Sequence, residues 1–93
     1  MNDINGFQRD LLYVISGRSR AKGVDIREVM ADYYGQKIHH GRLYPSLDTL
    51  ADKGLIRKGD INDRSNYYEI TDRGERELEA RRDWEDEVAT AEA

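Results

Sequence analysis

The fold of this chain is decided by one stretch, Arg42-Leu43-Tyr44-Pro45-Ser46-Leu47-Asp48-Thr49-Leu50-Ala51-Asp52-Lys53-Gly54. Four apolar side chains in it recur at helical spacing: Leu43, Leu47, Leu50 and Ala51. Such a stripe predicts a helix that begins at about His39 or His40, buries one face and ends at Lys53. Pro45 lies near the start of the helix, where bending accommodates the loss of one hydrogen bond.

The residues after this helix change from helical to alternating periodicity. Residues 55–58 are predicted to form a strand, residues 59–65 a turn rich in Asn, Asp and Gly, and residues 66–70 a second strand. In the second strand Tyr68 and Ile70 share one face, which we expect to point into the core. The segment therefore predicts a β-hairpin.

A final helix is predicted after the hairpin, capped by Thr71 and Asp72. Four apolar positions recur along it: Ala80, Trp84, Val88 and Ala91. A tryptophan in so charged a helix marks an interface, because large exposed apolar surfaces are uncommon in monomers. We interpret the stripe as a dimer contact; a pocket for a small-molecule effector around Trp84 is the alternative.

Two shorter helices are predicted upstream. Asn5 and Gln8 form a capping-box pair at the start of the first, which ends at Gly17. The second spans residues 25–35, with a short extended segment at Val24 before it. The order helix, helix, tight turn, helix, hairpin, helix is that of a winged helix-turn-helix.

The predicted fold class is therefore mainly α with a small β-hairpin. Residues 1–72 form the winged helix-turn-helix, and residues 73–93 form a C-terminal dimerisation helix in the same compact unit. With 93 residues, 38% of them hydrophobic, one small domain is expected. A monomeric core of this size is marginal, which favours a partner subunit.

Charge is unevenly placed along the sequence. The whole chain has 15 basic and 19 acidic side chains, which argues against a non-specific nucleic-acid binder. Residues 35–68 nevertheless carry six basic and four acidic side chains, whereas residues 69–93 carry four and ten. The basic middle leaves a local DNA-binding face open. Arginine outnumbers lysine eleven to four, a composition that we associate with salt-adapted, halophilic proteins.

Catalysis, metals and membranes find little support in the sequence. The chain has no cysteine, no nucleophile or phosphate-loop motif and no metal-ligand spacing, so we expect neither an enzyme nor a cofactor. His39 and His40 are adjacent and lack a third histidine, which makes a zinc site a poor interpretation. The polar start and the absence of a long apolar run predict a cytoplasmic protein with no membrane partner.

The polar face of the central helix carries the candidate DNA contacts, because its side chains suit base edges and phosphates. They are His39, His40, Arg42, Tyr44 and Ser46. The hairpin adds Arg64, Asn66 and Tyr67. The alternative for these side chains is simple solvation. The alternative for the protein is a winged-helix adaptor that binds another protein and no specific DNA.

Two motifs carry a family resemblance. The run from Arg42 to Leu50, followed by Lys53-Gly54-Leu55-Ile56, and the run from Arg64 to Gly74 resemble the PadR family of winged-helix transcriptional regulators, in a short form similar to haloarchaeal members. The resemblance implies a homodimer. We expect it to act as a repressor on double-stranded DNA, with its two central helices in successive major grooves of a pseudo-palindromic site. The resemblance also implies a dimer interface between the last helix and the first helix of the partner. The expected interface residues are Phe7, Leu11, Leu78, Trp84 and Val88.

Overall fold

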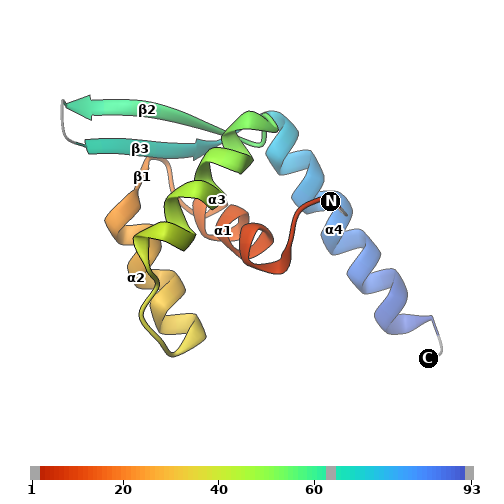
Figure 1. The fold of residues 1–93 in the computed structure, drawn as a ribbon. Coiled ribbons are helices and arrows are strands. Elements are labelled where there is room, and N and C mark those ends of the chain that lie inside the picture. The colour runs from red at the N-terminus through yellow and green to blue at the C-terminus, as the bar shows by residue number, and fades with distance from the viewer. Residues whose placement is uncertain (1–2, 63–64, 92–93) are drawn as a thin grey trace.

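The computed structural model describes residues 3–62 and 65–91, and its element order is the predicted one (Figure 1). The elements are α1 (Gly6–Ser16), β1 (Ala21–Lys22), α2 (Gly23–Tyr34), α3 (His40–Asp52), β2 (Ile56–Asn62), β3 (Ser65–Ile70) and α4 (Asp72–Thr90). Four helices and one small sheet confirm the mainly α fold class with a hairpin. α3 lies across α1, the hairpin extends to one side, and α4 extends to the other.

The start of α1 agrees with the prediction, whereas the start of α2 does not. Asn5 and Gln8 form the expected capping box, with each side chain accepting from the backbone of the other. The extended segment expected at Val24 lies earlier, at β1, and Val24 is inside α2. The helix begins at Gly23, before the predicted residue 25, because its N-cap residue is Lys22 and not Asp25. Asp25 sits in the first turn, where its carboxylate still favours the positive end of the helix.

The sheet is antiparallel, with strand order β1-β3-β2. The two long strands extend further than predicted, because Gly59 pairs with Tyr67 and Asp60 with Asn66 in what we expected to be a turn. A bulge follows between Asp60 and Asn62. Composition misled here, since a solvated hairpin can hold polar residues on both faces and need not show the alternation of a half-buried strand.

The core gathers one face of each helix and the inner face of the sheet. Its buried members are Phe7, Leu11, Leu12, Ile15, Ala21, Ile26, Met30, Ile38, Leu43, Leu47, Leu50, Leu55, Ile56, Tyr68 and Leu78. The predicted stripe of α3 and the inward position of Tyr68 are both observed. Burial also raises the pKa of the Tyr68 phenol, since the charged form would lose its hydration.

Three of the residues expected at a dimer interface belong to this core. Phe7, Leu11 and Leu78 pack against their own chain, so they have almost no surface left to offer a second copy. A helical stripe indicates burial but does not say which chain provides it, so the interface role expected for these three residues stays a prediction. Trp84 and Val88, by contrast, are 51% and 54% exposed on α4.

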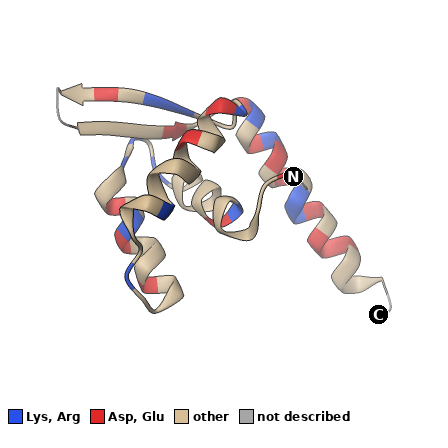
Figure 2. Ribbon diagram, viewed as in Figure 1, with Lys and Arg blue, Asp and Glu red and all other residues tan. Residues whose placement is uncertain are grey.

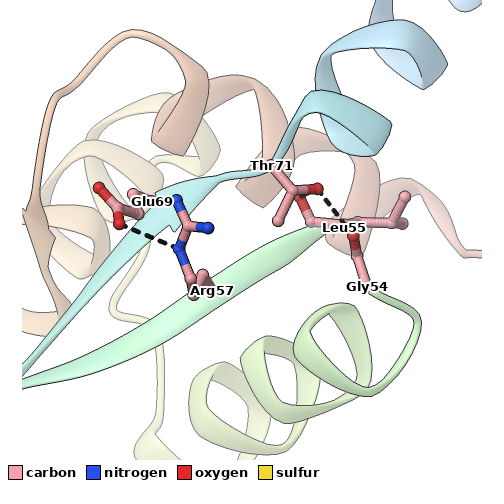
Figure 3. A network of polar contacts seen from close by, with 5 residues as sticks. All are labelled: Gly54, Leu55, Arg57, Glu69 and Thr71. Atoms are coloured by element: carbon pink, nitrogen blue, oxygen red, sulfur yellow. Dashed lines mark hydrogen bonds and ion pairs between the residues drawn. The ribbon is translucent and has the colours of Figure 1, made fainter.

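α4 is anchored at its first turn by Thr71 (Figure 3). The Thr71 hydroxyl lies 2.7 Å from the Gly54 carbonyl oxygen and 3.0 Å from that of Leu55, and it accepts from the Gly74 backbone N–H. A Cβ built on Gly74 would come within 2.2 Å of the Leu55 carbonyl oxygen, so only glycine permits this close approach. The base of the hairpin and the start of α4 are thereby locked together.

Arg57 and Glu69 form an ion pair across β2 and β3 at 3.1 Å, also shown in Figure 3.

No helix in the described part of the chain is both long and apolar enough to cross a membrane.

Candidate nucleic-acid interface

α3 presents its polar side chains on two flanks of the buried stripe. Successive helical residues are about 100° apart, so His40 and Tyr44 lie on one flank and Arg42 and Ser46 on the other. Arg42 is exposed and Ser46 is half-buried. His39 is the N-cap residue, with extended backbone and no side-chain capping bond, and is also exposed. The structure therefore does not collect all the predicted α3 contacts in one place.

A groove of about 460 Å³ runs beside the His40 flank, between α3, the start of α2 and β3. We call it the α2–α3–β3 groove. Its lining residues are Lys22, Gly23, Val24, His40, Tyr44, Ser65, Asn66 and Tyr68. Three predicted contacts, His40, Tyr44 and Asn66, thus meet here although the sequence separates them by up to 26 positions.

The electrostatics of the groove favour an anion. α2 begins in it, and the first backbone N–H groups of a helix are unpaired donors at the positive end of its dipole. Its N-cap residue, Lys22, makes no side-chain capping bond and is exposed. An ammonium group beside a helix N-terminus, with hydroxyl and amide groups opposite, matches the chemistry of a phosphate.

Tyr44 is held at this helix start by its neighbours. Its ring stacks on His40 with centroids 5.5 Å apart and an interplanar angle of 25°. Its hydroxyl lies over Gly23 so closely that a Cβ there would come within 2.7 Å of the oxygen. Arg27 in turn pairs with the His40 ring nitrogen Nε2. The arrangement holds the Tyr44 hydroxyl and the His40 imidazole at one wall of the groove, with Arg27 bonded to the imidazole.

The hairpin contributes less freely exposed surface than predicted. Tyr67, one of the predicted DNA contacts, is half-buried, because its ring packs over the backbone of Gly59. The Arg20 guanidinium covers that ring, 4.8 Å from its centroid. Arg64 lies outside the described residues. The hairpin side of the site is therefore represented by Asn66 and by the Arg20–Tyr67 pair.

Sequence reasoning missed the contribution of Arg20, Lys22 and Arg27. No candidate contact is predicted from the sequence among residues 18–23, although the alternation of Arg18, Arg20 and Lys22 just before a helix start was a usable signal. Arg27 could not be found in this way, because its importance depends on its pairing with His40.

The C-terminal half of α3 is less suited to a polyanion. Asp48 and Asp52 are exposed there, and the Asp48 side chain, 61% exposed, lies 4.0 Å from Lys58 Nζ. Figure 2 shows acidic positions continuing along α4, which leads away from α2 and from the hairpin. The beginnings of α2 and α3, which carry Lys22, Arg27 and Arg42, are therefore the part of this surface better suited to a polyanion.

Comparisons with known proteins agree with this architecture. The family model described as the transcriptional regulator PadR-like family matches residues 11–80. The structure of H. salinarum RosR grown from NaBr is 35% identical, with a TM-score of 0.90, over 98% of this chain and 82% of that one. A structure described as the hsRosR–S1 complex is 36% identical, with a TM-score of 0.84, over 89% of this chain and 73% of that one.

A PadR-like transcription factor from Bacteroides fragilis shares the fold, with a TM-score of 0.72 and 22% identity over 94% of this chain and 89% of that one. A comparison with curated protein sequences finds no match. The family model covers most of the chain, and a solved relative more than 30% identical covers nearly all of it. The chain therefore belongs to the PadR-like family of transcriptional regulators.

Proposed function

We propose that this regulator is a homodimer that represses transcription by binding a pseudo-palindromic DNA site. In this proposal the two copies of α3 enter successive major grooves, about 34 Å apart. The observation that carries it is the α2–α3–β3 groove, where Lys22, His40, Tyr44 and Asn66 surround the start of α2. A repressor of this kind acts by occupying DNA that the transcription machinery needs.

The groove residues and the other flank of α3 take different roles. A phosphate of the DNA backbone sits at the start of α2 and receives hydrogen bonds from its N–H groups, with Lys22 supplying charge. This contact fixes the register of the protein on the duplex. His39, Arg42 and Ser46 then face the base edges from the first turns of α3, since arginine pairs well with guanine.

Dimerisation is assigned to the outer half of α4. Beyond Leu78 every described residue of this helix except Arg81 is exposed, and Trp84 and Val88 form an apolar stripe one turn apart. An isolated helix so rich in charge gains little stability by itself, because most helical stability in proteins comes from tertiary packing. A second copy that covers the stripe provides that packing.

The test is a binding titration. Fluorescence anisotropy with duplex fragments from upstream of the protein's own gene should select one fragment, bound more tightly than its shuffled version. Lys22→Ala and Arg42→Ala should each weaken specific binding about tenfold or more, the usual effect of losing a charge-assisted contact. Arg76→Ala, which removes the same charge from an exposed position of α4, is the matched control and should bind like the unaltered chain.

A folded dimer that prefers no duplex sequence would overturn the proposal. The second candidate is an adaptor that binds another protein, favoured by the outward carboxylates of Asp48 and Asp52 on α3. In that case Asp48→Asn, and not Arg42→Ala, should weaken capture of a basic protein partner.

A further inference from the structure

Arg42 rests on a platform of two aromatic rings from two other helices. Phe7 of α1 and Tyr34 of α2 lie with their ring centroids 5.8 Å apart and tilted by 42°. The Arg42 guanidinium carbon is 4.0 Å from the Phe7 centroid and 5.8 Å from the Tyr34 centroid. Three helices therefore meet at one side chain that we assign to DNA.

The platform is itself held in place. Phe7 is buried in the core, so its ring cannot follow the arginine into solvent. Tyr34 donates a hydrogen bond from its hydroxyl to the Asp10 carboxylate, and its ring meets the edge of Tyr33. The same hydrogen bond, together with burial, raises the pKa of Tyr34, so its phenol stays protonated and keeps donating.

Stacking leaves the hydrogen-bonding edge of an arginine available. A guanidinium is planar, contacts an aromatic ring through its face and donates through its rim. Within residues 3–62 and 65–91, no hydrogen bond or ion pair ends on the Arg42 guanidinium, although the residue is exposed. The side chain is thus restrained in direction while its donors are unused.

We propose that Phe7, Tyr34 and Asp10 are positioning residues that preset Arg42 for DNA, a role that rests on the function proposed above. A long arginine side chain loses rotamer freedom when it is fixed by a ligand. The platform removes part of that loss before DNA arrives, because the arginine already occupies a limited range of directions. Binding is then tighter than the charge of Arg42 alone provides.

A double-mutant cycle tests the proposal. The affinity for one specific duplex is measured for the unaltered chain, Phe7→Leu, Arg42→Ala and the combination. Phe7→Leu should weaken binding about five- to tenfold when Arg42 is present, the range of a partly desolvated cation–π contact. It should have no further effect in Arg42→Ala. Arg42→Lys, which keeps the charge but not the planar group, should lose affinity like Phe7→Leu.

Two controls separate positioning from loss of core packing. Ile15→Val thins the buried face of the same helix two turns away and should leave DNA affinity unchanged. Tyr34→Phe keeps the ring and removes the hydrogen bond to Asp10, whereas Tyr34→Leu removes both. Affinity should fall in the order unaltered chain, Tyr34→Phe, Tyr34→Leu.

Nuclear magnetic resonance of the free protein gives a readout without DNA. The side-chain N–H signal of Arg42 should be shifted by the rings in the unaltered chain and should return to the position of a solvated arginine in Phe7→Leu. A normal signal in the unaltered chain, or an equal effect of Phe7→Leu with and without Arg42, overturns the proposal. If the unaltered chain binds no duplex, the proposed function itself has failed and the positioning role falls with it.

Discussion

Replacing Trp84 by alanine tests whether the outer half of α4 joins two subunits. Trp84 is 51% exposed, and its ring lies under the Arg81 guanidinium of the same helix, 4.6 Å from ring centroid to guanidinium carbon. No other element of the described chain covers that exposed half. A partner subunit that binds the stripe of Trp84 and Val88 should therefore cover it.

The size of the effect follows from this exposure. A buried tryptophan removes about 150–250 Å² from water, so half of the side chain corresponds to about 100 Å². At about 25 cal/mol per Å², covering that area contributes about 2.5 kcal/mol per subunit, and a twofold dimer makes the contact twice. The loss of about 5 kcal/mol weakens the dimer about a thousandfold or more.

Sedimentation velocity over a dilution series from nanomolar to tens of micromolar measures the change. The unaltered chain should be dimeric through most of the series, and Trp84→Ala should be monomeric through most of it. Asp86→Ala is the matched control, because it lies on the opposite face of α4. The reasoning is refuted if Trp84→Ala associates like the unaltered chain, or if the unaltered chain is monomeric at every concentration.

Three further predictions concern stability, measured by urea unfolding. Thr71→Val should lower the free energy of unfolding by about 1–2 kcal/mol, because it removes the cap of α4 and its link to the hairpin. Thr71→Ser keeps the hydroxyl and should be close to the unaltered chain in stability. Equal losses in the two variants would contradict the role of the hydroxyl. Gly74→Ala should cost about 1–3 kcal/mol because the Leu55 carbonyl blocks a Cβ; a stabilised variant would show that this contact opens easily. The raised pKa of Tyr34 stabilises the fold below about pH 10, the usual value of tyrosine, and this contribution is lost as the pH rises through the higher folded value. Tyr34→Phe should therefore lose less stability than the unaltered chain between neutral and strongly alkaline pH, and parallel pH profiles would count against the hydrogen bond to Asp10.

The helices were predictable because each has a local signal. The stripe of α3 and the capping box at Asn5 lie within a few residues of the element that they define. The position of the hairpin could be predicted from the sequence, but the length of its strands could not. Gly59 and Asp60 pair with β3 through backbone groups, which every residue type except proline supplies. The sequence patterns therefore predict the order of the elements more accurately than the residues at which each element begins and ends.

The candidate site was only partly predictable, because it is made by distant segments. His40 and Asn66 meet Lys22 only after β1 pairs with β3 and α3 packs beside α2. The stacking of Arg42 on Phe7 joins the first helix to the third, and no local pattern records it. The residues expected at a dimer interface differ for a similar reason: Trp84 is exposed on α4, whereas Leu11 is buried in the chain's own core.

The most direct test of the central claim is a hydroxyl-radical footprint of the dimer on its specific duplex. If the beginnings of α2 and α3 face DNA in both subunits, the footprint should show two protected backbone segments related by twofold symmetry, with centres about 10 base pairs apart. Lys22→Ala should weaken protection in both segments equally. A single protected segment, or a footprint that Lys22→Ala leaves unchanged, would contradict the assignment of the α2–α3–β3 groove to the DNA backbone.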